Sequence, residues 1–321
     1  MTVDYEDRLD EQSKAVLEAI PEEALDLSDI PRLRNTLDVL VDAMFADAPE
    51  VPGVDVKNHW APGPPGEPDV MVRVYTPSDL DGPVPGFYWI HGGGMVIGYA
   101  SMEDPASKAT AVEMGCVVAS VEYRLAPEHP HPAPIEDCYA GLKWFVDNSE
   151  SLGVDRERVV IGGGSAGGGL AAALALLVRD RGEIDIISQQ LIYPMLDHRS
   201  ITPSSHYVQH PKVWNRKCNI AGWTALLGES KDTDDVSPYA SPALAEDLSG
   251  LPPAFVIVGE LDLFVDEDVD YAMRLIQAGV STELHVFPGA FHGSELMLPT
   301  AETSRRWKAV QADALRRALY G

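Results

Sequence analysis

The spacing of hydrophobic and polar positions changes near residue 50 of the chain. Before it, residues 1–48 carry two amphipathic helical patterns, and the second places apolar side chains at steps of three and four: Leu33, Leu37, Leu40, Val41 and Met44. After it, Val54–Trp60 and Asp69–Tyr75 alternate apolar with polar residues and flank the turn-forming stretch Pro62–Pro68. The spacing predicts N-terminal helices followed by a β-hairpin.

Nearly continuous apolar runs alternate with helical patterns over the rest of the chain. The runs that predict strands are Gly86–Ile90, Cys116–Val121, Val159–Ile161, Gln189–Tyr193, Ala254–Val258 and Glu283–Phe287. Helices are predicted at Asp104–Met114, Ile135–Asn148, Gly167–Arg181, Asp268–Ala278 and Ala301–Leu319. Apolar strands separated by helices are typical of a parallel sheet that is covered on both faces. With the hairpin, the pattern predicts a mostly parallel, eight-stranded α/β sheet.

The alternation lapses between Pro194 and Pro252, where the chain is mixed in character. An insertion of this length within a sheet is often a lid or cap, although an extra packed helix without a role at the site is the alternative. We therefore expect residues 1–48 and 195–235 to form a helical cap. Residues 49–194 and 236–321 would then form the catalytic domain.

Composition excludes several classes of protein. The chain has 321 residues, 45% of them hydrophobic, which is enough for a large core. Its 24 Lys+Arg against 50 Asp+Glu give a formal net charge of −26, which disfavours nucleic-acid binding. The acidity itself fits solubility or adaptation to salt and identifies no function.

The N-terminus, the apolar runs and the cysteines give no sign of secretion, membrane insertion or disulfide bonding. Residues Met1–Asp7 lack the basic start of a secretory signal, and the apolar run Leu170–Val178 is too short to span a bilayer. Cys116, Cys138 and Cys218 form no C-x-x-C pair, so neither a disulfide framework nor a zinc site is expected. These features predict a cytoplasmic protein without membrane insertion.

The clearest chemical motif is Gly163-Gly164-Ser165-Ala166-Gly167, which fits G-x-S-x-G. It lies between a predicted strand and a predicted helix, where a tight turn exposes a serine nucleophile and glycines permit close approach of the backbone. A glycine-rich turn without chemistry is the alternative for this motif taken alone. Ser165 is therefore the candidate nucleophile.

A second motif, His91-Gly92-Gly93-Gly94, follows the predicted strand Gly86–Ile90 directly. When a serine attacks an ester carbonyl, the oxyanion that forms needs hydrogen-bond donors already in position. The backbone N–H groups of Gly92, Gly93 and Ala166 are the candidate donors. An ordinary loop or a phosphate-binding turn is the alternative, but no G-x-G-x-x-G or P-loop lysine accompanies the motif.

A serine nucleophile needs a base, and the base needs an orienting acid, both located after later strands. Asp262 follows the predicted strand Ala254–Val258, and His292 follows Glu283–Phe287. Competing acids Asp266, Asp268 and Asp270 fall toward the next helix, where they are expected as N-terminal acids or on a solvated face. Competing histidines lie in a strand, in a Pro-rich loop or in the insertion: His285, His129, His131, His198, His206 and His210.

Residues that line a substrate pocket are harder to choose from the sequence. Gly94 and Gly164 adjoin the two motifs, and Trp214 and Trp223 are aromatic residues of the insertion. As the alternative, the tryptophans belong to the insertion's own hydrophobic core. No H-E-x-x-H motif and no dinucleotide fingerprint is present, so neither a metal site nor a nucleotide cofactor is expected.

At these residues the chain resembles the hormone-sensitive-lipase-like group of α/β-hydrolases, the bacterial family IV esterases. Besides the two glycine motifs, the resemblance rests on Tyr123-Arg124-Leu125-Ala126-Pro127-Glu128, Ala240-Ser241-Pro242, Leu251-Pro252-Pro253, Gly259-Glu260-Leu261-Asp262 and His292-Gly293. It implies the α/β-hydrolase fold with a helical cap, and hydrolysis of short- to medium-chain carboxylic esters without a cofactor. Within the group, the chain is most similar to esterases of small acetyl esters, including heroin-type esterases. The group often dimerises, so a homodimer is expected.

Two departures and two alternatives accompany the resemblance. Gly164 stands where the group has Asp or Thr, which removes a side chain able to brace the turn or touch the cap, and Asp262-Leu263-Phe264 replaces Asp-Pro-Leu. Amide, lactone or carbamate hydrolysis would use the same triad. A ligand receptor on this fold is disfavoured because plant gibberellin receptors, which are similar to the group, have lost the histidine that His292 supplies here.

Overall fold

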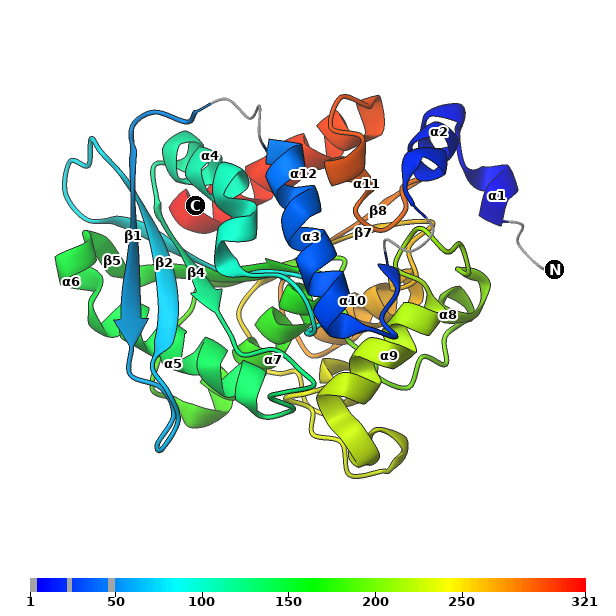
Figure 1. Cartoon of the computed structure of the whole chain (residues 1–321). Helices are drawn as coiled ribbons and strands as arrows, with labels where there is room; N and C mark the ends of the chain where they lie inside the picture. The colour runs from blue at the N-terminus through cyan, green and yellow to red at the C-terminus, as the bar shows by residue number, and fades with distance from the viewer. Residues whose placement is uncertain (1–4, 22–24, 46–49) are drawn as a thin grey trace.

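The computed structural model describes residues 5–21, 25–45 and 50–321, with the backbone alone for residue 38 and residues 40–45. At its centre is a sheet with the strand order β1-β2-β4-β3-β5-β6-β7-β8 (Figure 1). The strands are β1 Val54–Ala61, β2 Val70–Pro77, β3 Val84–Ile90, β4 Val117–Glu122, β5 Val154–Gly164, β6 Ser188–Ile192, β7 Ala254–Gly259 and β8 Thr282–Phe287. β2 is antiparallel to β1 and β4, and all other pairs are parallel. The predicted α/β class and mostly parallel eight-stranded sheet are confirmed.

The central strands are apolar on both sides because helices cover both faces of the sheet. In β4, Val117 and Ala119 pack in the largest core cluster, while Val118 between them packs in another. Helices α4 (Asp104–Met114) and α12 (Glu302–Tyr320) cover one face. Helices α5 (Ala133–Asp147), α7 (Ala166–Arg181) and α10 (Val265–Gln277) cover the other.

Short elements join these layers close to the strand ends. They are η2 Ala100–Glu103, α6 Ser149–Leu152 and α11 Ser294–Met297. η2 and α11 follow β3 and β8 respectively, so both lie in segments that begin at the carboxyl ends of parallel strands. In open α/β sheets this edge is where ligands bind.

The N-terminal segment and the insertion contact each other. The first contains α1 Tyr5–Arg8, α2 Glu11–Ala19 and α3 Ile30–Phe45, and the second contains α8 Pro203–Tyr207, α9 Arg216–Leu227 and η3 Gly228–Asp232. Lys212 donates to the carbonyl of Glu18 at 3.0 Å, and the ring of Tyr5 lies 6.1 Å from that of His210. Figure 1 shows α1, α2, α8 and α9 on the side of the molecule away from β1.

Buried Leu17 and Leu33 join the N-terminal helices to the main hydrophobic core. The face predicted to contain Leu40, Val41 and Met44 lies outside the described side chains, as does the expected boundary at residues 48 and 49. Residues 1–4, the first part of the N-terminal segment considered above, are also outside the described chain.

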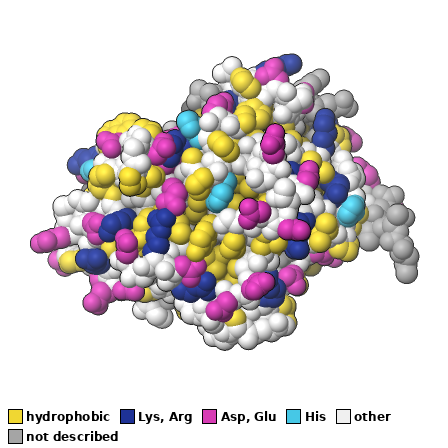
Figure 2. Space-filling model, turned by 90° about the horizontal axis from the view of Figure 1, so that it is seen from below, with side chains coloured by type: hydrophobic (Ala, Val, Ile, Leu, Met, Phe, Trp, Pro, Cys, Tyr) yellow, Lys and Arg dark blue, Asp and Glu magenta, His cyan; other side chains and the backbone are white. Residues whose placement is uncertain are grey.

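The surface charge is spread out. On the face shown in Figure 2, Asp and Glu side chains are dispersed among Lys and Arg, and apolar side chains gather near the middle. Within the described ranges, the search for a helix with the length and hydropathy of a membrane span finds none.

Candidate active site

Ser165 occupies a strained turn between the last residue of β5 and the first residue of α7. Its φ of 57° and ψ of −120° lie outside the regions favoured by L-residues, which costs about 1–3 kcal/mol. Both motif glycines are required by close backbone contacts: a Cβ at Gly163 would lie 2.3 Å from Gly167 O, and one at Gly167 would lie 2.0 Å from Ile90 O. The sequence therefore forms this turn because these positions have no side chains.

The structure brings Ser165, His292 and Asp262 together in one hydrogen-bonded chain. His292 Nε2 lies 3.0 Å from Ser165 Oγ, and His292 Nδ1 lies 2.8 Å from Asp262 Oδ2. The other carboxylate oxygen, Asp262 Oδ1, accepts the backbone N–H of Phe264 at 3.0 Å. With Asp262 accepting at Nδ1–H, the neutral imidazole presents Nε2 as an acceptor toward the serine hydroxyl.

The loops that carry the acid and the histidine are bound to each other. Leu261 N–H donates to Ala290 O at 2.9 Å, and Glu260 Oε2 accepts the N–H of Gly289 at 3.1 Å. A Cβ at Gly259 would lie 2.2 Å from Ala290 O, so this close approach also needs glycine. The two strand ends therefore fix the distance between Asp262 and His292.

Two of the competing acids after Asp262, Asp266 and Asp268, lie in the first turn of α10, as predicted for N-terminal acids. Asp268 is nevertheless fully buried, and neither of its carboxylate oxygens has a hydrogen-bond partner within the described chain. Burial raises the pKa of Asp268 well above its usual value. Asp266 Oδ2 accepts the N–H of Ser204, which lies in the first turn of α8.

The glycine loop lies directly beside the nucleophile. A Cβ at Gly92 would lie 2.9 Å from Gly164 O and 3.4 Å from Ser165 Cβ. Gly93 has φ +116°, and its carbonyl accepts the N–H groups of Val96 and Ile97. Among the described residues, no backbone carbonyl accepts the N–H of Gly92 or Gly93.

His91 anchors this loop, a role not predicted from the sequence. Its ring is buried and stacks on Tyr123 with centroids 4.3 Å apart, and its Nδ1 lies 2.8 Å from Gly92 O. Burial lowers the pKa of His91 to about 4, so the ring is neutral and Nδ1–H donates to the carbonyl. Tyr123 hydroxyl donates to His91 O at 3.0 Å, which ties the loop to the segment after β4.

The four residues predicted to line a substrate pocket lie in different environments. Trp214 packs against Gly94, where a Cβ would lie 2.1 Å from Trp214 Cη2. Trp223 has no exposed surface, and its ring meets His198 edge to face, which is a core position of the insertion. A Cβ at Gly164 would lie nearest to Tyr193 and Trp89, at 3.7 and 3.8 Å, so the first carbon of a side chain at this position would meet residues of the sheet and its loops.

A pair of acids behind His292 was not predicted from the sequence. The ring of Tyr193 lies 4.6 Å from the imidazole of His292, and its hydroxyl donates to Glu295 Oε1 at 2.5 Å. Glu103 accepts from Trp89 Nε1. Burial raises the pKa of Glu295, and it raises the pKa of Glu103 to about 7. Nothing in the local sequence distinguishes these glutamates from solvated ones.

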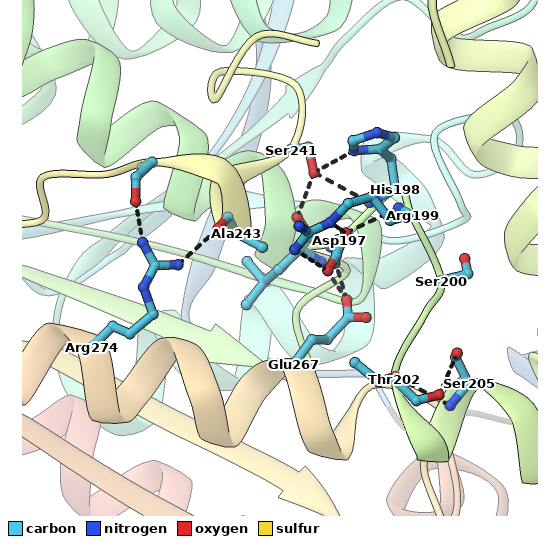
Figure 3. A network of polar contacts seen from close by, with 12 residues as sticks. Asp197, His198, Arg199, Ser200, Thr202, Ser205, Ser241, Ala243, Glu267 and Arg274 are labelled. Atoms are coloured by element: carbon cyan, nitrogen blue, oxygen red, sulfur yellow. Dashed lines mark hydrogen bonds and ion pairs between the residues drawn. The ribbon is translucent and has the colours of Figure 1, made fainter. Parts of the chain in front are cut away.

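Another buried acid fixes the start of the insertion. Glu267 Oε1 on α10 accepts the N–H groups of Leu196 and Asp197 at 2.8 and 3.0 Å. Figure 3 shows Glu267 pointing from its helix toward Asp197, with Ser241 on the other side of the same segment. Ser241 Oγ donates to Leu196 O at 3.0 Å. The chain that leaves β6 is therefore held close to the helix that follows Asp262.

Comparison with known proteins agrees with this geometry. A family model described as the alpha/beta hydrolase fold matches residues 87–296. The carboxylesterase NlhH of Mycobacterium tuberculosis (strain ATCC 25618 / H37Rv) is 38% identical over 258 residues, which covers 78% of this chain and 79% of the relative. Arylacetamide deacetylase of Bos taurus is 34% identical over 295 residues, 72% of this chain and 74% of the relative. A solved structure of a bacterial heroin esterase superposes with a TM-score of 0.94 at 46% identity and covers 98% of this chain and 99% of that chain.

The sheet, the serine turn and these relatives together define an α/β-hydrolase that cleaves carboxylic esters. The chain belongs to the hormone-sensitive-lipase-like family of this fold, as the motifs predicted.

Proposed function

We propose that the protein hydrolyses short- to medium-chain acyl esters with Ser165 as nucleophile, His292 as base and Asp262 as orienting acid. The observation that carries this assignment is the continuous hydrogen-bonded chain, with 3.0 Å from Nε2 to Oγ and 2.8 Å from Nδ1 to Oδ2. Both distances are within the range in which a base accepts the proton of its nucleophile.

In the first half of the reaction, Ser165 Oγ attacks the ester carbonyl carbon while its proton moves to His292 Nε2. Asp262 stabilises the imidazolium that forms. Collapse of the tetrahedral intermediate breaks the bond to the alcohol oxygen, and His292 returns the proton to the leaving alcohol. In the second half, water attacks the acyl-enzyme while its proton moves to His292. Collapse of the second tetrahedral intermediate breaks the bond to Ser165 Oγ, which takes the proton back from His292 as the carboxylic acid leaves.

The oxyanion is stabilised in both halves by N–H groups of Gly92, Gly93 and Ala166. The first two lack a backbone acceptor in the described chain, and the third opens α7, where the first N–H groups have no acceptor within the helix. The helix N-terminus adds a favourable dipole for the negative charge. No cofactor takes part in this scheme.

The N-terminal segment and residues 195–235 form the cap over this site in the proposal. Trp214 lies over Gly94 and limits the room beside the glycine loop, which favours a small acyl group. The similarity to a structure named bacterial heroin esterase favours acetyl esters of a bulky alcohol as substrates. A homodimer remains a prediction from the family.

Hydrolysis of p-nitrophenyl esters from acetate to dodecanoate tests the proposal, with Ser165→Ala as the blank. We expect a Ser165-dependent rate that is highest for short chains. Turnover that Ser165→Ala retains in full contradicts the assignment of the nucleophile. A receptor on this fold would show no Ser165-dependent turnover of any ester.

Amide hydrolysis is a second candidate, favoured by the 34% identity to a protein named arylacetamide deacetylase. The same triad serves both reactions, and the leaving amine must receive its proton from His292. The ratio of kcat/KM for p-nitroacetanilide to that for p-nitrophenyl acetate decides between them. A ratio above one assigns the protein to amides.

A further inference from the structure

An arginine of the N-terminal segment binds the backbone of the glycine loop from outside the sheet. Arg34 lies on α3, and its Nε donates to Val96 O at 2.8 Å. Its Nη2 donates to Ala126 O at 2.9 Å. These two carbonyls lie on different segments, one after β3 and one after β4.

A carboxylate holds the guanidinium in this orientation. Arg34 Nη1 and Nη2 donate to the two oxygens of Glu128, each at 2.8 Å. The Arg34 hydrogen bond lowers the pKa of Glu128, so the carboxylate is charged at neutral pH. Paired, parallel N–H···O bonds fix the plane of the guanidinium and thus the direction of its remaining N–H groups.

The carbonyls that Arg34 binds belong to one compact unit with the oxyanion glycines. Gly93 O accepts from Val96 N and Ile97 N at 3.1 and 3.0 Å, which closes a tight turn. Met95 O in that turn accepts the N–H of Ala126 at 2.9 Å. A shift of Val96 or Ala126 therefore moves the peptide planes that orient the N–H groups of Gly92 and Gly93.

The insertion also contacts this turn. Trp214 packs on Gly94, and its Nε1 donates to Asn219 Oδ1 at 3.2 Å. Asn219 Nδ2 in turn donates to Ser200 Oγ at 2.9 Å. The turn from Gly93 to Ile97 is thus contacted at Val96 by Arg34 and at Gly94 by Trp214.

We propose that Arg34 is a positioning residue for the oxyanion hole: its bonds to Val96 O and Ala126 O aim the N–H groups of Gly92 and Gly93 at the substrate carbonyl. The inference rests on the proposed function, which gives those glycines their role. It makes the N-terminal segment part of the catalytic machinery for ester hydrolysis and not only a cover over the substrate.

The effect should appear mainly in kcat. Donors of an oxyanion hole act on charge that develops in the transition state, and removing one costs about 10²–10³ in rate. If the two N–H donors are misplaced, part of this rate enhancement is lost, while binding of the neutral ester changes little. Arg34→Gln leaves both carbonyls without the forked donor, so we expect kcat for p-nitrophenyl acetate to fall at least about tenfold with KM within about threefold.

The experiment compares Arg34→Gln and Arg34→Lys with Arg32→Gln, an exposed arginine on the same helix. Lys retains one charged donor, so it should restore part of kcat, and Arg32→Gln should keep the wild-type value. A second readout is the affinity for a trifluoromethyl ketone, whose adduct carries an oxyanion. We expect it to weaken in Arg34→Gln in proportion to kcat.

Unchanged kcat in folded Arg34→Gln, or a rise in KM alone, overturns the inference. If Arg34→Gln does not fold, Arg34→Ala with added N-ethylguanidinium replaces it, and failure of the guanidinium to raise kcat also overturns the inference. These results leave the proposed function intact, because that function fails only if Ser165→Ala retains turnover or if the wild type shows no Ser165-dependent turnover of any ester.

Discussion

Tyr193 and Glu295 share a hydrogen bond of 2.5 Å directly behind the catalytic histidine candidate. Tyr193 is held with a positive φ of 35° at the end of β6, and Glu295 comes from α11, so the bond joins two loops at the site. Burial is the main cause that raises the pKa values of both groups. The hydroxyl therefore remains a donor over the working range of pH, and it supports the imidazole ring that packs on it.

Removing this hydroxyl should destabilise the fold. Tyr193→Phe keeps the ring against His292 but leaves a buried carboxyl without its tyrosine donor, which costs about 1–3 kcal/mol in free energy of unfolding. Denaturant titration measures the loss. Tyr239→Phe is the matched control, because the hydroxyl of Tyr239 donates to Asp180 in an exposed pair. Its removal should lower the free energy of unfolding by less than about 1 kcal/mol. Equal losses in the two variants would contradict the prediction.

Glu103 should make stability fall as pH rises toward neutrality. Its pKa is about 7 in the folded protein against 4.5 for the unperturbed group, so the folded state binds more protons than the unfolded state between these values. Glu103→Gln keeps an acceptor for Trp89 and cannot ionise. Between pH 5 and 7 we expect wild-type stability to decline relative to Glu103→Gln by up to about 2 kcal/mol. Parallel stability curves would show that the carboxyl does not titrate in this interval.

Asp262 and Asp268 should respond very differently to the same substitution. Asp262→Asn loses an acceptor for His292 Nδ1–H and favours the wrong tautomer, for which a loss of about 10³–10⁴ in kcat is expected. Asp268→Asn replaces a buried carboxyl group whose oxygens have no hydrogen-bond partner in the described chain, so kcat should stay within about threefold of wild type. Steady-state kinetics on one short ester compares the two. Similar losses would place Asp268 in the catalytic chain.

The glycines of the serine turn should differ in their tolerance of a methyl group. A Cβ at Gly164 has its nearest neighbour at 3.7 Å, so Gly164→Ala should keep kcat/KM within about tenfold. A Cβ at Gly163 meets backbone at 2.3 Å, so Gly163→Ala must displace the turn and should lower kcat/KM by more than about 10². A near-native Gly163→Ala would mean that the turn relaxes at little cost.

Much of the architecture was predictable because apolar periodicity reports burial. The helix Asp104–Met114 was predicted with its observed bounds, and the strands of the sheet were placed within a few residues. The start of β5 was missed by five residues, since Asp155 to Arg158 are polar and lie where the strand leaves the core. These polar residues do not show the apolar pattern of a buried strand. The segment is nevertheless part of β5, and Val154 at its start pairs with Val84 of β3.

The site was predictable only where backbone geometry demands a particular residue type. Gly163 and Gly167 mark the serine turn because no larger residue fits, and strand ends restrict where an acid and a histidine can meet it. No comparable sequence signal exists for Glu103, Glu295 and Arg34, because their hydrogen-bond partners come from other segments of the chain. A charged residue in a helix looks the same in sequence whether it is solvated or bound to a loop.

β8 is the last strand of the sheet and lies at its edge, and His292 follows it in sequence. An edge strand has one pairing partner, so it opens with a smaller free energy than the central strands. The position of the histidine relative to Ser165 therefore depends on how firmly one peripheral strand is attached, and not only on the stability of the whole core.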